Sequence, residues 1–341
     1  MSSIRSIGFV LLAVFAVACG DDGAPLGPID AAPLDAFEPP WWTPEPGEAA
    51  NWDIQLVAPF NVVASARAMY DLDLWDVTTA ETITYDDSST VTVPAGPLAG
   101  KIAELQAAGG IVVCHVDLGA IALDDPDASK FMGFEVAPPN RPTSPAVGSV
   151  IGWSVVGDPD KRYLDLRTAS RPLWEAIMFK RLDLAKRLGC DAIDAAWMDQ
   201  IDPGFPLVIT GSDNDLTNYF RDVVGQLHQR ELSAGLRVVS MVGKTLSDGF
   251  VESYDFAIDE RCAEFEDCDF VRRFAQERKA IFGLDYESDG VTDRDLDGEP
   301  DGISFASACT RMNLPMDWIH KDADAAFRPS SAYHKRQSEC P

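Results

Sequence analysis

Short hydrophobic runs alternate along the chain with longer stretches of helical periodicity. The runs have the length of strands, and the stretches between them carry apolar residues three or four positions apart. Strands that alternate with helices in this order are typical of a parallel sheet in an α/β fold. We predict strands over Asp53–Val57, Met69–Leu74, Ile111–Val116, Tyr163–Leu166, Ala192–Ala196, Leu236–Met241, Phe256–Ile258, Ala280–Leu284 and Met316–Ile319.

Residues that begin or end helices support the intervening elements. Pro97 and Pro172 stand at the start of two helical stretches, and Ser212 is a favourable N-cap for a third. We predict helices over Pro97–Gln106, Arg171–Leu188, Asp213–Leu232, Phe270–Glu277 and Phe305–Met312. Eight or nine strands with helices between them, over about 280 residues, fit a TIM-type (β/α)8 barrel in a single domain.

A doubly wound sheet is the alternative architecture. Its nucleotide-binding versions lose support, because no G-x-G-x-x-G motif follows the first strand and the chain has no P-loop.

The N-terminus carries a pattern of its own. Arg5 precedes an apolar run over Ile7–Val17, which ends in Ala16-Val17-Ala18-Cys19. The run is too short to span a bilayer and has the features of a signal peptide over residues 1–18. We expect a bacterial lipoprotein in which Cys19 is lipidated, exported to face the periplasm or the cell exterior. An ordinary cleavage site with an incidental cysteine is the alternative.

The remaining chain divides by composition. Residues 19–40 are rich in Ala, Pro and Asp without hydrophobic periodicity, which is typical of a disordered tether. We therefore expect the barrel domain over residues 41–325 and a C-terminal tail over residues 326–341, with the membrane reached only through the lipid anchor. We expect a monomer.

The chain has a net charge of −27, from 28 basic and 55 acidic residues, and this charge limits which ligands it can bind. Nucleic acid is excluded, because its binding depends on cationic contacts to phosphate. A cationic ligand such as an amino-sugar polysaccharide is compatible with this charge. Solubility alone would also explain it.

Seven cysteines include six besides Cys19, an even number that favours disulfides in an oxidising compartment. Cys262 and Cys268 flank a short acidic loop and are expected to pair. A Cys309–Cys340 bridge would hold the C-terminal tail. Cys114 and Cys190 lie in apolar runs, where simple burial would account for them. No cysteine or histidine pair has the spacing of a zinc site.

One acidic loop, residues 289–302, has oxygen ligands at alternate positions followed by glycine, like the first half of a calcium loop. The candidate ligands of a structural calcium ion are Asp293, Asp295, Asp297 and Asp301. Position twelve, counted from Asp293, is Ser304 instead of the bidentate glutamate of an EF-hand. A solvated acidic loop is the alternative.

Acidic residues recur where the predicted strands end, which is the edge of a barrel that carries active sites. They include Asp71, Asp73, Asp117, Asp194, Asp199, Asp259, Glu260, Asp285 and Glu287. Paired carboxylates perform glycoside hydrolysis without a cofactor, one as acid and the other as nucleophile or base. Trp197 and Tyr286 are among the aromatic residues that could stack on sugar rings. Any single acid could instead be a cap, a salt bridge or a surface charge.

Several segments together resemble glycoside hydrolase family 114. They run in the expected order and include Trp52–Leu56, Tyr70–Asp76, Ile111–Gly119, Tyr163–Arg167, Arg181–Asp191, Phe256–Cys262 with Cys268, and Ile281–Glu287. The resemblance implies a TIM-like barrel, and its type activity is that of an endo-α-1,4-polygalactosaminidase. It also implies that Glu260 is one catalytic carboxylate, because Asp259-Glu260-Arg261-Cys262 matches an Asn-Glu-Gln-Cys motif of the family.

This sequence also departs from the family pattern, as a divergent member would. Asp194 and Ala196 stand where a Glu-Pro-Asp-Asn type motif is expected, so the family's catalytic aspartate falls at Ala196. The family's Lys-Asn-Asp segment is placed at Met241–Gly243, and its Trp- and Arg-rich loop at Ala120–Pro126.

These observations lead to three hypotheses for the function. The first is a glycosidase that acts on a galactosamine-containing polysaccharide. Its catalytic residues would be Glu260 with Asp194 or Asp199, and its substrate-binding residues Asp73, Asp117, Asp285, Glu287, Trp197 and Tyr286. The second is a glycan-binding or surface protein that kept the barrel and lost catalysis. A calcium-stabilised structural protein is a third reading.

Overall fold

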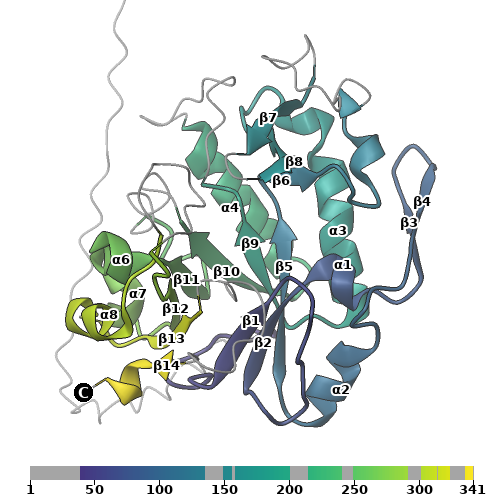
Figure 1. The fold of residues 1–341 in the computed structure, drawn as a ribbon. Helices are drawn as coiled ribbons and strands as arrows, with labels where there is room; N and C mark the ends of the chain where they lie inside the picture. Colours follow the sequence, from purple (N-terminus) through teal and green to yellow (C-terminus); the bar gives the residue numbers. More distant parts are fainter. Residues whose placement is uncertain are drawn as a thin grey trace, which may run out of the picture. The chain divides into compact units, whose positions relative to one another are not determined.

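A parallel sheet forms the centre of the protein in the computed structural model (Figure 1). The structure describes residues 39–134, 149–155, 158–199, 214–239, 249–290, 301–312, 314–322 and 335–340. Eight strands pair in parallel. In sheet order they are β1 (Trp52–Gln55), β2 (Met69–Asp73), β5 (Ile111–Asp117), β9 (Ala192–Ala196), β10 (Ser233–Val238), β11 (Phe256–Glu260), β12 (Ile281–Tyr286) and β13 (Asp317–Lys321).

The sheet curls into a nearly closed barrel, which confirms the predicted (β/α)8 fold. Side chains bridge the seam between its first and last strands. Trp52 Nε1 donates to the carbonyl oxygen of Asp317 (2.6 Å), and Lys321 Nζ donates to that of Ile54 (2.7 Å). A short ninth strand, β14 (Lys335–Arg336), pairs antiparallel with β13.

Large apolar side chains fill the barrel near the start of its strands. The ring of Phe282 packs edge-on against Trp52 and Phe256, at centroid distances of 5.4 and 5.5 Å. Ile54, Ile258 and Ile319 belong to the same buried cluster. Because this end of the barrel excludes water, inward polar side chains are confined to the other end of the strands, where each would otherwise cost free energy to bury.

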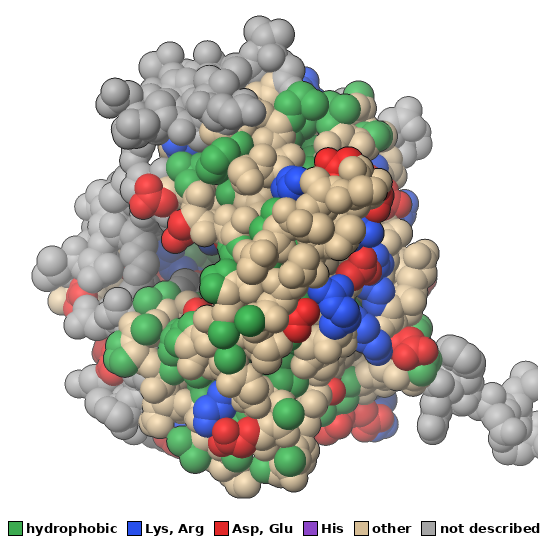
Figure 2. Space-filling view, turned by 90° about the vertical axis from the view of Figure 1, so that its right-hand side faces the viewer, with side chains coloured by type: hydrophobic (Ala, Val, Ile, Leu, Met, Phe, Trp, Pro, Cys, Tyr) green, Lys and Arg blue, Asp and Glu red, His purple; other side chains and the backbone are tan. Residues whose placement is uncertain are grey.

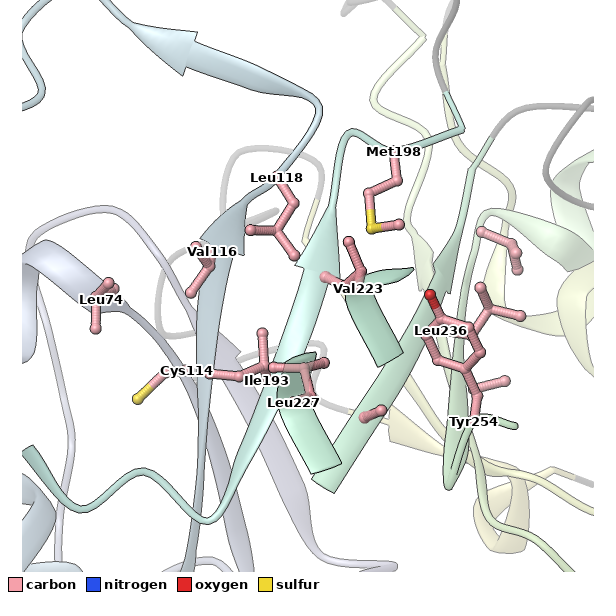
Figure 3. Close-up of a cluster of buried hydrophobic side chains, with 14 of the residues drawn as sticks. Leu74, Cys114, Val116, Leu118, Ile193, Met198, Val223, Leu227, Leu236 and Tyr254 are labelled. Atoms are coloured by element: carbon pink, nitrogen blue, oxygen red, sulfur yellow. The ribbon is translucent and has the colours of Figure 1, made fainter. Parts of the chain in front are cut away.

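The outer face of the sheet packs against helices, as Figure 3 shows for α4 (Asp215–His228). The buried residues of α4 recur at helical spacing. Two of them, Val223 and Leu227, belong to one buried cluster with Ile193 of β9 and Leu236 of β10. The N-cap is Asn214, whose side chain accepts a hydrogen bond from Thr217 N (2.9 Å); Ser212, the predicted cap, lies outside the described residues.

The other helices are α1 (Leu74–Val77), α2 (Lys101–Ala107), α3 (Glu175–Leu188), α6 (Cys262–Phe265), α7 (Arg272–Gln276) and α8 (Phe305–Arg311). Short 3₁₀ segments lie at Ala128–Lys130, Arg171–Leu173, Cys268–Val271 and Gln337–Glu339. The predicted helix over Arg171–Leu188 is therefore two elements, a 3₁₀ turn followed by α3. In the part of the chain that the structure describes, no helix has the length and apolar character needed to cross a bilayer.

Acidic and basic side chains are interspersed on the face seen in Figure 2. Ion pairs join α3 to its neighbours, including Arg230 to Asp183 (2.7 Å) and Lys180 to Asp86 (3.0 Å). Basic side chains around α3 are thus engaged by nearby carboxylates instead of forming one continuous basic surface.

The structure corrects two strand predictions. Tyr163 and Leu164 belong to β8 (Asp158–Leu164), which pairs antiparallel with β6 (Ala120–Ala122) and β7 (Ile151–Val155) outside the barrel. A hairpin of β3 (Glu81–Thr84) and β4 (Thr90–Val93) was also missed. The segment predicted as Leu236–Met241 begins and ends earlier, as β10. An apolar run shows that a strand is buried, but not which sheet receives it.

The described residues contain three disulfides, which span 76, 6 and 31 positions of the sequence. Cys262–Cys268 and Cys309–Cys340 form as expected. Cys114 and Cys190, which simple burial would have explained, also pair, with Cα atoms 5.9 Å apart and a sequence separation of 76. The outward side of β5 brings Cys114 to the turn between α3 and β9, which a local pattern does not reveal.

Removing the Cys114–Cys190 bridge should cost more stability than removing Cys262–Cys268. A bridge across a long loop constrains the unfolded chain more, so Cys114→Ala/Cys190→Ala should lower the free energy of unfolding by about 2–4 kcal/mol. Cys262→Ala/Cys268→Ala, which opens a separation of six, is the matched control with the smaller loss. Denaturant titrations measure both, and equal losses would contradict the expectation.

Candidate active site

Two adjoining cavities lie at the ends of the barrel strands. The first, about 320 Å³, is lined by Ala196, Arg237 and Glu260 among others, and we call it the Glu260 cavity. The second, about 440 Å³, lies beside α1 and the loop after β6, and we call it the Trp75 cavity. Asp73 and His115 line both, so the two cavities form one cleft. This is the end of the barrel at which TIM-barrel enzymes carry their active sites.

Strand alternation brings three charged residues from adjacent strands into the barrel. Asp194 of β9, Arg237 of β10 and Glu260 of β11 are each buried. Arg237 donates through Nη1 to Asp194 Oδ2 and through Nη2 to Glu260 Oε2, both at 2.6 Å. The hydroxyl of Tyr286, on β12, donates to Glu260 Oε1 (2.7 Å). Both oxygens of Glu260 are therefore engaged, which fixes the orientation of the carboxyl group.

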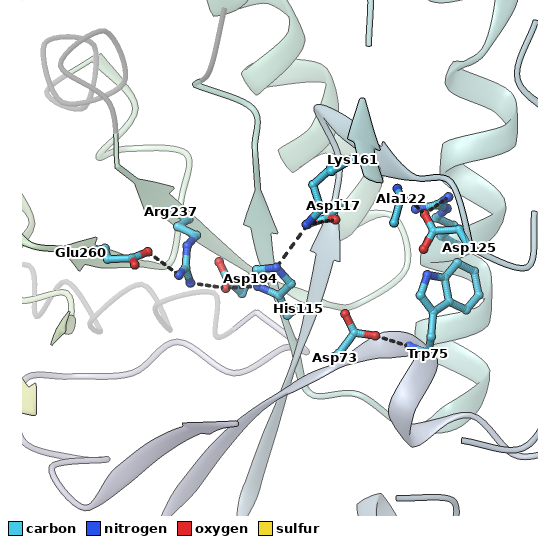
Figure 4. A network of polar contacts seen from close by, with 11 residues as sticks. Asp73, Trp75, His115, Asp117, Ala122, Asp125, Lys161, Asp194, Arg237 and Glu260 are labelled. Atoms are coloured by element: carbon cyan, nitrogen blue, oxygen red, sulfur yellow. Dashed lines mark hydrogen bonds and ion pairs between the residues drawn. The ribbon is translucent and has the colours of Figure 1, made fainter. Parts of the chain in front are cut away.

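The network continues toward β5, as Figure 4 shows. His115 Nδ1 lies 2.6 Å from Asp194 Oδ2, and its Nε2 lies 3.2 Å from Asp117 Oδ1. Lys161 of β8 completes the series with Nζ 2.7 Å from Asp117 Oδ2. Negative and positive groups alternate along the whole line, which offsets the cost of burying them.

These contacts set the protonation states. Burial would lower the pKa of His115, but the charges of Asp194 and Asp117 outweigh burial and raise it to about 10. Burial would raise the pKa of Asp194, but Arg237 and His115 hold it near 2. In the same way, Lys161 and His115 hold the pKa of Asp117 below its usual range against burial. At neutral pH the imidazolium and both carboxylates are charged.

Beneath the cleft, Asp71 of β2 lies beside Asp194 and His115, with ligand atoms of the three within 4.8 Å of one another. Such a group could hold a metal ion, but its chemistry does not fit one. Both ring nitrogens of His115 face carboxylates and carry protons, so neither offers a lone pair. Burial and the charge of Asp194 raise the pKa of Asp71 well above its usual range, which disfavours the anionic form that a metal ligand needs.

Ala196 lines the Glu260 cavity at the end of β9, so no carboxylate projects from that position. The nearest acid on the strand, Asp194, is fully buried and lines neither cavity. One guanidinium separates it from Glu260, which places the two carboxylates within roughly 8 Å, a spacing that glycosidases use. Burial, and not distance, keeps Asp194 from the cleft.

The loop after β9 contributes two predicted residues to the same cavity. Trp197 has a positive φ of 63°, and Lys161 Nζ lies 4.7 Å from the centroid of its ring. Gly119 is required beside it, because a Cβ there would lie 1.9 Å from the carbonyl oxygen of Trp197. Asp199 accepts a hydrogen bond from Val239 N (2.9 Å), which ties this loop to the end of β10.

The structure gathers most of the predicted site residues. Asp73, Asp199, Trp197 and Glu260 line the Glu260 cavity, and Asp117 lines the Trp75 cavity. Tyr286 reaches the site through its hydrogen bond to Glu260.

Asp285 and Glu287 are not brought into the cleft. Asp285 points out of the barrel, where its carboxylate accepts hydrogen bonds from Trp318 Nε1 (2.9 Å) and Glu264 N (3.2 Å). Glu287 accepts one from Phe305 N (3.2 Å) at the start of α8. The geometry does not support the substrate-binding role that we predicted for them, because Asp285 of β12 faces α6 and Glu287, just after β12, faces the start of α8.

Arg237 and Lys161 belong to the site but were not among the residues that we predicted for it. Placing the strand over Leu236–Met241 put Arg237 near its beginning, whereas β10 ends one residue after it. Met241–Gly243, where we had placed the Lys-Asn-Asp segment, lie outside the described residues. Lys161 comes from the small antiparallel sheet, which the apolar pattern did not separate from the barrel.

The predicted calcium loop is only partly within the described residues. Asp293, Asp295 and Asp297 lie outside them, as does Cys19. Asp301 is buried, and its carboxylate is paired with Arg261. A calcium site in this loop stays a prediction.

The model of glycoside-hydrolase family GH114 matches residues 31–337. The crystal structure of Aspergillus fumigatus Ega3 in complex with galactosamine is similar at 20% sequence identity, over 86% of this chain and 97% of that one, with a TM-score of 0.59. The glycoside hydrolase domain of PelA from Pseudomonas aeruginosa aligns at 11% identity over 85% and 100%, with a TM-score of 0.46. No curated protein sequence matches the chain.

Proposed function

The chain belongs to glycoside-hydrolase family GH114, and we propose that it hydrolyses a galactosamine-containing polysaccharide with Glu260 as one catalytic carboxylate. The observation that carries this proposal is the position of Glu260. It ends β11, lines the cavity and is held by Arg237 and Tyr286. A carboxylate fixed in this way can take a proton from water as that water attacks the anomeric carbon. This chemistry uses only carboxylates and water, so it requires no cofactor.

The charges of the cleft support an amino sugar as substrate. Asp76 and Asp124 line the Trp75 cavity outside the ion-pair series in which Lys161 and His115 neutralise Asp117. Galactosamine residues that lack the N-acetyl group carry an ammonium charge, which such a wall attracts. The structure of Ega3 contains galactosamine, which agrees with this choice. The predicted α-1,4 linkage and a monomeric enzyme remain part of the proposal.

The direct test is the release of reducing ends from partly deacetylated polygalactosamine. We expect turnover that falls when the same polymer is fully N-acetylated, because the ammonium groups are then lost. Binding of the polymer without any release of reducing ends would contradict hydrolysis and favour the catalytically degenerate alternative.

We also propose that the protein is exported and anchored through Cys19. The three disulfides support an oxidising compartment outside the cytosol. Expressed in a bacterium, the full chain should partition with membranes and incorporate labelled fatty acid, and Cys19→Ser should abolish both while the barrel still folds. Equal membrane association of the variant and the natural chain would contradict the anchor.

A further inference from the structure

Asp73 occupies the junction of the two cavities. It is the last residue of β2, its side chain is half-buried, and it lines both the Glu260 cavity and the Trp75 cavity. Among the described carboxylates that line the cleft, it alone touches both cavities. A sugar chain that runs from one cavity to the other therefore passes this carboxyl group.

The orientation of Asp73 is fixed by the helix that follows it. Its Oδ1 accepts a hydrogen bond from Trp75 N (2.8 Å), so the side chain is the N-cap of α1. Figure 4 shows the carboxyl group between Trp75 and the pair formed by His115 and Asp117, with its second oxygen directed away from Trp75. One oxygen positions the group and the other faces the cleft.

Asp73 and Glu260 lie on opposite walls of the barrel. In sheet order, β5, β9 and β10 separate β2 from β11 on one side, and β12, β13 and β1 separate them on the other. Two carboxyl groups that face each other across a barrel mouth can flank a glycosidic bond with a water molecule between one of them and the sugar. Ala196 ends β9, midway between β2 and β11 in sheet order, and it lines the same cavity, so its small side chain leaves room there for that water.

We propose that Asp73 is the proton donor of the reaction. This inference rests on the proposed function. The bond between the anomeric carbon and the leaving oxygen breaks, its electron pair stays on that oxygen, and the Asp73 carboxylic acid gives the oxygen its proton. A water molecule forms the new bond to the anomeric carbon and gives its proton to Glu260. Asp73 ends as a carboxylate and Glu260 as an acid, and exchange with solvent restores both.

The surroundings of the two carboxyl groups match these roles. Burial raises the pKa of Asp73 to about 7, so a large share of it is protonated at neutral pH. Glu260 instead has a cationic partner, the guanidinium of Arg237, at 2.6 Å. One carboxyl group buried without an ion pair and one beside a cation is the arrangement expected of an acid and a base that work together. Asp117, next to Asp73, is unsuited as a donor because Lys161 and His115 keep it ionised.

Asp199 is the rival donor, because it also lines the Glu260 cavity. Its exposed fraction is only 1%, and it accepts a hydrogen bond from Val239 N, whereas the Asp73 side chain is half-buried. Access to a glycosidic oxygen therefore favours Asp73.

The test compares two leaving groups in Asp73→Asn, which keeps the N-cap oxygen. On an α-1,4-galactosamine oligosaccharide, we expect kcat to fall about 10²-fold or more, the size of a general-acid contribution. On the dinitrophenyl glycoside of the same oligosaccharide, whose leaving group needs no proton, kcat should fall by less than about tenfold. The wild-type kcat/KM should decline as pH rises through about 7, because the donor must be protonated, and this decline should disappear in Asp73→Asn.

Asp86→Asn serves as the matched control, since Asp86 lies in the turn between β3 and β4 and pairs with Lys180. Thermal unfolding of each variant verifies that it folds. Equal losses on both substrates, or no loss, would overturn the role of Asp73, as would a leaving-group dependence seen in Asp199→Asn and not in Asp73→Asn. If Glu260→Gln lowers turnover while Asp73→Asn does not, only this inference fails. If the wild type turns over neither substrate, the proposed function fails with it.

Discussion

Glu260→Gln should lower kcat/KM on partly deacetylated polygalactosamine by about 10²–10⁴-fold, the range that a positioned acid or base contributes. The amide has nearly the shape of the carboxylate, so it can still meet the hydroxyl of Tyr286 and lie against Arg237. It cannot take a proton from water. The loss should therefore appear mainly in kcat, with a smaller change in KM. Initial rates of reducing-end release across substrate concentrations separate the two constants.

Glu266→Gln is the control for this experiment. It makes the same chemical change six positions further along the chain, where the exposed carboxylate of Glu266 pairs with Arg311. Its rate should equal that of the wild type. Hydrolysis that survives Glu260→Gln at the wild-type rate would remove Glu260 from the mechanism, however well the barrel matches the family.

Arg237→Met should lower the free energy of unfolding by about 3–5 kcal/mol, because breaking a buried ion pair leaves uncompensated charge behind. Arg237 is 4% exposed and is shared by Asp194 and Glu260, each at 2.6 Å. Methionine fills much of the space but supplies no cation. Loss of the guanidinium leaves His115 as the remaining ion-pair partner of Asp194 in this network.

Denaturant titration measures this loss, and Arg278→Met provides the comparison. The side chains of Arg278 and Glu45, which form an ion pair, are 77% and 66% exposed. Removing this pair should therefore change the free energy of unfolding by no more than about 1 kcal/mol. In the double variant Arg237→Met/Asp194→Asn the cost should shrink, since one of the stranded charges is gone. If Arg237→Met and the wild type unfold with the same midpoint denaturant concentration, the network does not stabilise the barrel.

Much of the fold follows from the pattern of the chain. All eight barrel strands overlap segments of the predicted set, because strands buried on both faces read as apolar runs whatever their partners are. Tyr163–Leu166 has the same kind of pattern, yet it joins an antiparallel sheet. Whether such a run joins the barrel or the antiparallel sheet depends on which strands lie next to it in space. A run of four residues does not contain that information.

The sequence predicted where the candidate site lies better than which acids belong to it. The repetition of acids at strand ends indicated the correct end of the barrel, and Glu260 and Asp73 indeed line the cleft. Asp285 has the same local appearance but points outward to Trp318. In a strand, a shift of one residue moves a side chain to the opposite face. An error of one residue in a strand boundary is therefore enough to assign an acid to the wrong side.

By itself the sequence determined the α/β barrel, the position of its acids at one end and the Cys262–Cys268 bridge, since each depends on residues close together in the chain. Only the tertiary structure showed that Asp194 is sealed beneath the cleft by His115, which lies 79 residues away, and by Arg237. The same holds for the Cys114–Cys190 bridge and for the junction at Asp73. Contacts between strands far apart in sequence decide which charges are neutralised, and a charge neutralised in the interior is not available to a substrate.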